Sequence, residues 1–360
     1  MKRNFRFFLV CIFSFGISIY FFSCKKSQVK AEQLPEPQIV AGVARVHGKL
    51  NDPKSQITSL ILRFKNPVTA SENTIETQVE KDGSFYFETT IECSPIFCSL
   101  YYPRYGAVLI ELFSDEDKKI DLGLDSSGKL IINNVSGNSL LTNRDKVNYS
   151  IVTGRYLDYY NTNEFICNMA PEEYADNEMD MLKVRINHAM RDAKFSYSGE
   201  SYTLNELKIL HLRGALLQYK ERLEMLCRDK GTLQFQEPGI QYYSFLESFD
   251  LNNPQYIYCT FYSDMMQRVL TRKAFDIPLI ADMPVAEWID KVKSILSDLV
   301  GFDSGQFYDL LAAHSYAKQF NDDGTPLSDK QINNIKVYFG DGEIAKIFLR
   351  KNEEIIKFKF

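Results

Sequence analysis

The chain has 360 residues, of which 45% are hydrophobic, so it is long and apolar enough to form well-packed cores in two domains. Its 42 basic and 47 acidic residues give a formal net charge of −5 at pH 7. This mild acidity argues against nucleic acid as a partner, because nucleic-acid binding needs a clustered basic surface.

The first residues of the chain have the pattern of an export signal. Three basic residues near the start are followed by an uncharged, apolar run that extends from Phe7 to Ser23. The run ends in a small residue, then Cys24, then two lysines, and this order resembles the cleavage site of bacterial lipoproteins. We therefore expect residues 1–23 to be a lipoprotein signal peptide, and Cys24 to become the lipidated N-terminus that anchors the protein in a membrane.

An uncleaved membrane helix is the alternative for this segment, although the run is a little shorter than the roughly 20 apolar residues that cross a bilayer. Both interpretations place the remainder of the chain outside the cytoplasm. Removal of residues 1–23 would leave 39 basic and 47 acidic residues, a net charge of −8. Because Lys25 and Lys26 follow Cys24 where acidic residues would indicate surface display, we expect an anchor in the outer membrane that faces the periplasm.

The next segments predict a tether and a β-sandwich. Residues 24–38 are polar with two prolines, which is typical of a tether. Over residues 39–137 the hydrophobic period is 2 and turn residues recur at short intervals, which predicts an antiparallel sandwich. Residues 81–84, Lys-Asp-Gly-Ser, predict a hairpin turn. The expected strands lie near residues 43–49, 57–64, 74–80, 85–91, 97–101, 107–113, 119–124 and 129–133.

From residue 138 onward the hydrophobic period changes to 3.6, which predicts an all-helical domain over residues 138–360. Pro171 and Pro284 each precede an apolar stripe with helical spacing. Residues 203–206 and 328–331 both have the spacing of a capping box, so each predicts the start of a helix. The complete pattern predicts an α+β protein in which an N-terminal antiparallel β-sandwich is followed by an all-helical domain.

The cysteines are odd in number once the anchor is set aside. With Cys11 in the signal and Cys24 lipidated, five of the seven cysteines remain. Cys93 and Cys98 are the only close pair, and they could form a disulfide in an oxidising compartment. Two buried strand thiols are the equal alternative. The others are expected to be core residues on apolar helix faces: Cys167, Cys227 and Cys259.

No complete catalytic or metal-binding motif occurs in the sequence. The four histidines include no i, i+4 pair, and no Gly-x-Ser-x-Gly, phosphate loop or Cys-x-x-Cys is present. We therefore assign no catalytic residue, no metal and no cofactor. A run of aromatic residues on a sandwich loop could contact a glycan or a peptide, with packing inside the sandwich as the alternative. Its members are Tyr101, Tyr102 and Tyr105.

The order of these parts resembles a known family. A lipoprotein signal, a small β-sandwich with Val-Glu-Lys-Asp-Gly-Ser-Phe-Tyr-Phe at residues 79–87, and a helical segment resemble the N-terminal region of the TlpA-like thiol:disulfide oxidoreductases of Bacteroidota. Residues 327–353 resemble the stretch that precedes the thioredoxin-like domain in those proteins. Catalysis in that family belongs to a C-terminal domain with Trp-Cys-x-x-Cys. This chain ends at Phe360 before such a domain, so the resemblance carries over no catalytic residue.

Three expectations for function follow. The first is a non-enzymatic envelope lipoprotein, an accessory or truncated relative of these oxidoreductases, whose surface binds a ligand or a partner such as a thioredoxin-like protein. The second is an oxidoreductase relative with a residual redox role through Cys93 and Cys98. The third is a glycan- or peptide-binding lipoprotein.

Overall fold

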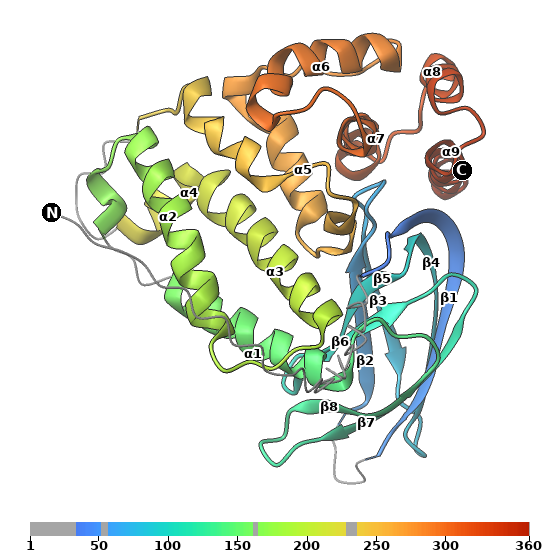
Figure 1. Cartoon of the computed structure of the whole chain (residues 1–360). Helices are drawn as coiled ribbons and strands as arrows, with labels where there is room; N and C mark the ends of the chain where they lie inside the picture. The colour runs from blue at the N-terminus through green and yellow to red at the C-terminus, as the bar shows by residue number, and fades with distance from the viewer. Residues whose placement is uncertain (1–33, 52–56, 161–164, 228–235, 360) are drawn as a thin grey trace, which may run out of the picture. The chain divides into compact units, whose positions relative to one another are not determined.

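Figure 1 shows the computed structural model, which describes residues 34–51, 57–160, 165–227 and 236–359. The expected signal peptide, the lipidation site Cys24 and most of the expected tether lie outside the described residues. Gln33 to Phe360 belong to one compact unit.

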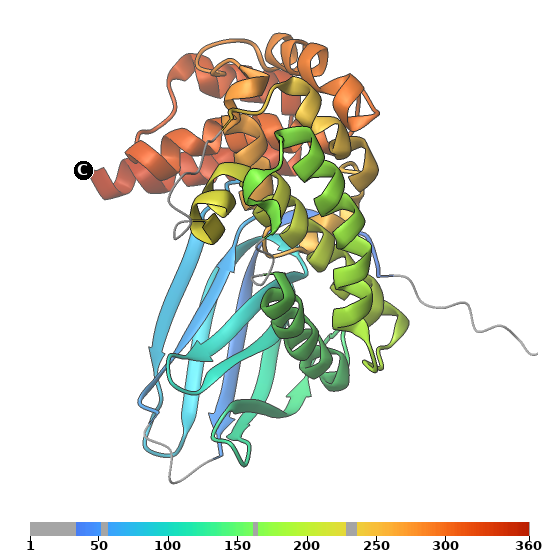
Figure 2. The same cartoon turned by 90° about the vertical axis from the view of Figure 1, so that its left-hand side faces the viewer.

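Two four-stranded sheets form the first part of the described chain (Figures 1 and 2). The strands are β1 (Gln38–Leu50), β2 (Ser59–Lys65), β3 (Glu72–Gln78), β4 (Ser84–Ser94), β5 (Ile96–Tyr102), β6 (Gly106–Leu112), β7 (Asp117–Leu124) and β8 (Leu130–Ser136). Sheet A has the order β4-β1-β7-β8, and sheet B has the order β3-β2-β5-β6. Sheet A is mixed because β1 and β7 are parallel, whereas the other neighbouring strands are antiparallel.

The turn at residues 81–84 is present, but the expected hairpin is not. Gly83 has a φ of 87°, and its N–H donates a hydrogen bond to the carbonyl of Glu80 (2.8 Å). However, β3 pairs with β2 in sheet B, and β4 pairs with β1 in sheet A. The turn therefore carries the chain from one sheet to the other, and Phe85 and Phe87 of β4 then join the buried cluster of the sandwich.

Apolar side chains fill the space between the sheets. Burial alternates along the strands because successive side chains of a strand point to opposite faces. The buried cluster consists of Ala44, Val46, Leu50, Ile57, Leu60, Leu62, Phe64, Phe85, Phe87, Ile91, Ile96, Cys98, Leu100, Ile110, Leu112, Ile120, Leu122 and Leu130.

Helices make up most of the remaining described chain, so the α+β class predicted from the sequence is confirmed. The α-helices are α1 (Asn143–Tyr160), α2 (Pro171–Met190), α3 (Tyr197–His211), α4 (Tyr219–Cys227), α5 (Tyr262–Thr271), α6 (Val285–Val300), α7 (Gln306–Asp323), α8 (Asp329–Phe339) and α9 (Glu343–Lys359). A π-helix, η2 (Leu212–Leu216), follows α3. Short 3-10 helices are η1 (Phe165–Asn168), η4 (Ile240–Phe249), η5 (Pro254–Tyr258) and η6 (Lys273–Phe275).

Several predicted helix starts are confirmed. Pro171 is the first residue of α2, and Pro284 directly precedes α6. The capping box at the start of α8 is complete. Ser328 Oγ accepts a hydrogen bond from the Gln331 N–H (3.1 Å), and Gln331 Oε1 accepts one from the Ser328 N–H (2.8 Å). Both side chains thereby satisfy backbone donors that a helix leaves unpaired at its start.

The second predicted capping box, at residues 203–206, is wrong. Helix α3 starts earlier, where Ser196 Oγ accepts a hydrogen bond from the Gly199 N–H (3.1 Å). Thr203 therefore lies inside the helix, and its hydroxyl donates to the Gly199 carbonyl (2.7 Å). Glu206 accepts a hydrogen bond from the backbone N–H of Thr260 (3.0 Å), far along the chain.

The loop between β2 and β3, residues 66–71, joins the sandwich to the helices. Three helical side chains donate hydrogen bonds to its carbonyl groups: His314 Nε2 to Pro67 O (2.7 Å), Asn321 Nδ2 to Thr69 O (2.9 Å) and Ser263 Oγ to Asn66 O (3.3 Å). Glu92 of β4 accepts hydrogen bonds from the backbone N–H groups of Val68 (3.2 Å) and Thr69 (2.8 Å). The loop is thus held from both sides, and these bonds satisfy five of its backbone groups.

Candidate functional site

The outer face of sheet B is divided between a covered half and an open half. On the covered half, Phe97 of β5 stacks on Tyr202 of α3, with ring centroids 4.2 Å apart, and meets Tyr258 edge-on at 5.5 Å. Farther along β5, Tyr101 has the same strand parity as Phe97 and therefore points to the same face. Tyr101 is only half-buried, so the helices do not cover this end of the face.

Tyr101 belongs to a strip that crosses three strands. It lies directly opposite Ile61 of β2 and Ala107 of β6 in the antiparallel register. Directly opposed side chains share one face of a sheet and are close enough to contact each other. Ile61 is half-buried and Ala107 is exposed. We call these three residues the open strip.

Charged side chains flank the open strip. Arg63, the next outward-facing residue of β2, donates a hydrogen bond from Nε to Glu72 Oε1 of β3 (2.6 Å). Glu76 of β3 lies directly opposite Ile61. An aromatic ring beside apolar side chains with polar groups at its border is the usual composition of a surface that contacts sugars or peptides.

The other two tyrosines of the predicted aromatic run pack in the sandwich. Tyr102 and Tyr105 have ring centroids 5.5 Å apart, and both pack against the buried cluster between the sheets. Since Tyr101 points to the opposite face, the three rings form no common surface. The packing alternative holds for Tyr102 and Tyr105, and Tyr101 alone remains a candidate for ligand contact.

Of the two alternatives for Cys93 and Cys98, a disulfide or two buried strand thiols, the structure has the second: both are buried free thiols. Cys93 lies on β4 of sheet A and packs in the cluster of the helical part, whereas Cys98 lies on β5 of sheet B and packs between the sheets. Their positions differ by five, an odd number, and the chain changes sheets at Pro95, so their side chains enter different cores. Burial raises the pKa of both thiols, which leaves little of the reactive thiolate at neutral pH.

A disulfide that the sequence did not reveal joins Cys167 of η1 to Cys227 at the end of α4, 60 residues apart. Cys167 and Cys227 were expected to be core residues on apolar helix faces, and no local sequence pattern marks them as a disulfide pair. Cys259, the third free thiol among the described residues, is buried as expected.

Two completely buried carboxyl groups have a raised pKa, a property that often marks functional sites. Burial is the main cause for both Glu92 and Glu206. Glu92 holds the loop at residues 66–71, and Glu206 accepts hydrogen bonds from Thr260 and from the hydroxyl of Tyr149 (3.1 Å). Glu92 thus ties β4 to the loop between β2 and β3, and Glu206 ties α3 to α1 and to the segment before α5, so we assign both a structural role.

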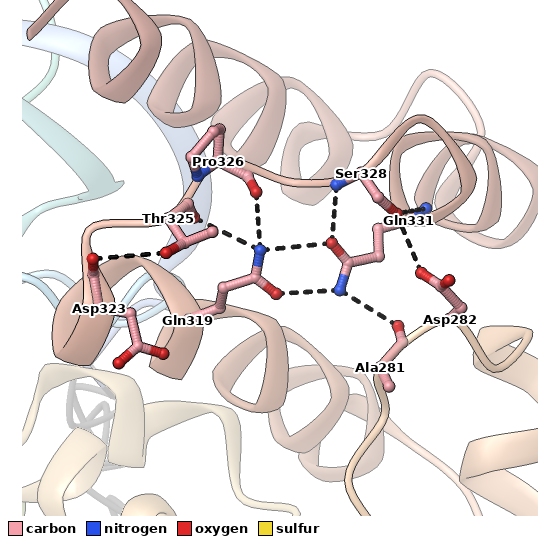
Figure 3. Close-up of a pocket in the computed structure, with 8 residues that line it drawn as sticks. All are labelled: Ala281, Asp282, Gln319, Asp323, Thr325, Pro326, Ser328 and Gln331. Carbon is pink, nitrogen blue, oxygen red and sulfur yellow. Dashed lines mark hydrogen bonds between the residues drawn. The ribbon is translucent and has the colours of Figure 1, made fainter. Parts of the chain in front are cut away.

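An open depression of about 540 Å³ lies between the end of α7, the start of α8 and the loop before α6 (Figure 3). Two glutamine amides in its wall face each other. Gln331 Nε2 donates to Gln319 Oε1 (3.0 Å), and Gln319 Nε2 donates to the carbonyl of Pro326 (2.7 Å). Gln331 Nε2 also donates to the Ala281 carbonyl (3.3 Å). These amides use their donors and acceptors to join three chain segments, so the depression is primarily a structural junction.

Within the described residues, no three His, Cys, Asp or Glu side chains lie close enough together to hold a metal ion. No helix in this part of the chain combines the length and apolarity needed to cross a membrane.

Comparison with known proteins finds no matching family model, no similar curated protein and no similar solved structure.

Proposed function

We propose that the chain is a non-enzymatic lipoprotein of the bacterial cell envelope, anchored through Cys24 in the outer membrane and facing the periplasm, which presents a binding surface to a partner or ligand. A thioredoxin-like envelope protein remains the partner that the family resemblance suggests.

The state of the cysteines is the observation that carries this proposal. Cys167 and Cys227 form a disulfide, and such bonds persist in oxidising compartments, the periplasm included. The other three cysteines in the described residues are buried thiols. Burial raises the pKa of each of them. This combination supports an exported protein whose cysteines stabilise the fold. We do not propose a redox role for Cys93 and Cys98, because their side chains belong to different cores.

Metabolic labelling with an alkyne analogue of palmitate tests the anchor. The full-length protein should take up the label, and Cys24→Ser should abolish it. Cys11→Ser removes the other N-terminal cysteine and should leave labelling unchanged. Label retained in the Cys24→Ser variant would contradict the lipid anchor. Degradation of the protein by protease added to whole cells would contradict the orientation towards the periplasm.

Insulin reduction tests the absence of redox activity. The protein, assayed with dithiothreitol, should give no insulin precipitation above the rate with dithiothreitol alone. Activity above that rate that disappears in Cys93→Ser or Cys98→Ser would restore the redox alternative.

A second candidate function, binding of a glycan or a peptide, is favoured by the open strip. A glycan array and a peptide panel would identify the ligand, and Tyr101→Ala should then reduce binding at least tenfold, a loss of about 1.4 kcal/mol. Tyr86→Ala is the matched control, because Tyr86 is a 48% exposed tyrosine on β4 of the other sheet. Equal binding by the Tyr101→Ala variant and the unaltered protein would exclude the strip as the contact surface.

A further inference from the structure

Three helices, α2, α3 and α4, contribute to a buried cluster of charged and titratable side chains around Glu178 of α2. Both Nη groups of Arg185 donate hydrogen bonds to the Glu178 carboxylate, one of them at 3.1 Å. Arg222 of α4 places Nη2 at 3.5 Å from Glu178 Oε1, and His211 at the end of α3 places Nε2 at 3.7 Å from Oε2. Glu178, Arg185 and His211 are 0% exposed and Arg222 is 2% exposed.

Two neighbours of His211, Tyr156 of α1 and Glu178 of α2, indicate which ring nitrogen carries the proton. The hydroxyl of Tyr156 lies 2.6 Å from His211 Nδ1, a contact in which either atom can be the donor. Nε2 faces the Glu178 carboxylate at 3.7 Å, and since an ionised carboxylate only accepts hydrogen bonds, we assign the proton to Nε2 and the acceptor role to Nδ1. Burial lowers the pKa of His211 to about 3, which makes the ring neutral at neutral pH. Burial also raises the pKa of Tyr156 and Tyr160, so both phenols are neutral.

The charges of the cluster do not balance. Burial opposes ionisation of Glu178, but the hydrogen bond from Arg185 and the charges of both arginines hold its pKa below the ordinary value, so Glu178 is ionised. Among the described residues, one carboxylate therefore faces two guanidinium groups, which leaves one positive charge without a counter-charge. Stacking of Arg222 on the Tyr160 ring, 3.6 Å from the centroid, offsets part of this charge but supplies no anion.

Within the part of the chain that the structure describes, four N–H donors of the same cluster have no hydrogen-bond partner. They are Arg185 Nε, Arg222 Nε, Arg222 Nη1 and His211 Nε2. A buried donor without a partner costs free energy, and an unpaired buried charge costs more. Unsatisfied donors and an excess positive charge thus occur together, and a bound anion that accepts hydrogen bonds would compensate both.

We propose that this cluster binds one small monovalent anion of the size of chloride, held by the free N–H groups of Arg185, Arg222 and His211. The ligand is small because its binding groups are buried, and it is monovalent because one positive charge needs compensation. It is an acceptor only, because every free group of the cluster is a donor. The site lies next to η2, and π-helical turns of this kind often accompany functional sites.

Thermal unfolding of the detergent-solubilised full-length protein tests the proposal. At equal ionic strength, chloride should raise the unfolding midpoint over gluconate by about 2 °C or more, with the mass-action dependence on concentration expected of a ligand that binds the folded state. Arg222→Met removes the excess charge and should abolish the difference. Arg104→Met also removes one positive charge, but from the exposed turn after β5, so this variant should retain the difference between chloride and gluconate.

Equal midpoints in chloride and gluconate would overturn the proposal and assign the donors to bridging water, which shows no anion specificity. Should Arg222→Met fail to fold, crystals of the unaltered protein soaked in bromide decide the matter. An anomalous peak within hydrogen-bond distance of Arg222 Nη1 and His211 Nε2 is the expected result, and no peak at these atoms would exclude the site.

Discussion

The buried cluster between the two sheets of the sandwich consists of aliphatic and aromatic side chains and one thiol, whereas the helical part buries a carboxylate, two guanidinium groups and a histidine beside its aromatic rings. The apolar layer stabilises the fold in proportion to the area that it removes from water. A buried ion pair contributes little net stability, but any arrangement that separates its partners is strongly penalised. The two regions therefore differ in what they tolerate: the sandwich is sensitive to lost volume and the helical part to lost charge.

Two buried carboxyl groups of the strands have their partners outside the strands. Glu111 of β6 pairs with Lys146 of α1 and accepts a hydrogen bond from the Leu141 N–H (3.0 Å). Glu92 of β4 holds the loop at residues 66–71. These buried carboxyl groups of the strands therefore lie where the sheets contact α1 and the loop at residues 66–71.

The largest effect is expected for Glu178→Gln. The substitution keeps the shape of the side chain but leaves two buried guanidinium groups without a carboxylate, so the free energy of unfolding should fall by about 3–5 kcal/mol. Chemical denaturation measures the loss. Glu88→Gln, which removes a carboxylate from the exposed pair with Arg45, is the control and should change stability little. Similar losses in both variants would contradict the contrast between the two regions.

Removal of volume from the sandwich should cost nearly as much. Leu62 of β2 is completely buried, and Leu62→Ala should lower the free energy of unfolding by about 2–5 kcal/mol, because a cavity remains where the side chain was. Leu279→Ala, at a position that is 77% exposed, serves as the control in the same denaturation experiment. A loss well under this range for Leu62→Ala would show that the apolar layer can collapse around the missing side chain.

Acid should weaken the junction between the two regions through His314. Burial lowers the pKa of His314 to about 4, below its ordinary value of 6.5, so the unfolded chain binds more protons than the folded one between these values. Stability is therefore lost as the pH falls from 6.5 to 4, by about 3 kcal/mol from this residue. His314→Gln keeps an N–H donor for Pro67 and should lose correspondingly less stability over this interval.

The control for this titration is His188→Gln, at an exposed position of α2. Its loss of stability on acidification should equal that of the unaltered protein. If His314→Gln loses as much stability as the unaltered protein, another group is responsible for the acid sensitivity.

The smallest effect is expected at the start of α8. Ser328→Ala removes the hydroxyl that accepts the Gln331 N–H and should cost about 1 kcal/mol of unfolding free energy. Ser328→Gly should cost only a few tenths of a kcal/mol, because glycine suits the backbone of a capping position. An unchanged free energy of unfolding in the Ser328→Ala variant would show that the cap does not depend on the hydroxyl.

Local patterns predicted the elements of this fold well. All eight strands have counterparts in the expected segments, because alternation of apolar residues is a local property of the chain. The pairing of strands is not local, so the turn at residues 81–84 was interpreted as a hairpin although it connects two sheets. Likewise, Ser328 and Thr203 both begin a capping-box pattern, but the groups at residues 203 and 206 bond elsewhere.

The candidate sites were harder to predict, because their parts lie far apart in the sequence. Tyr101 was identified from the aromatic run, but its separation from Tyr102 and Tyr105 depends on the faces of β5. The disulfide of Cys167 bridges 60 residues. The buried charge cluster was not predicted, because Glu178 and Arg185 of α2 meet their other partners, His211 and Arg222, only through the packing of separate helices.

The loop at residues 66–71 has a consequence for how the protein is made. Its bonds to Ser263, His314 and Asn321 span sequence separations of 197 to 252 residues. During synthesis the strands emerge first, and the carbonyl groups of this loop must wait for α5 and α7 before they gain their final partners. Such late, long-range closure slows folding. Folding of the sandwich is therefore expected to be completed only when the C-terminal half of the chain is also present.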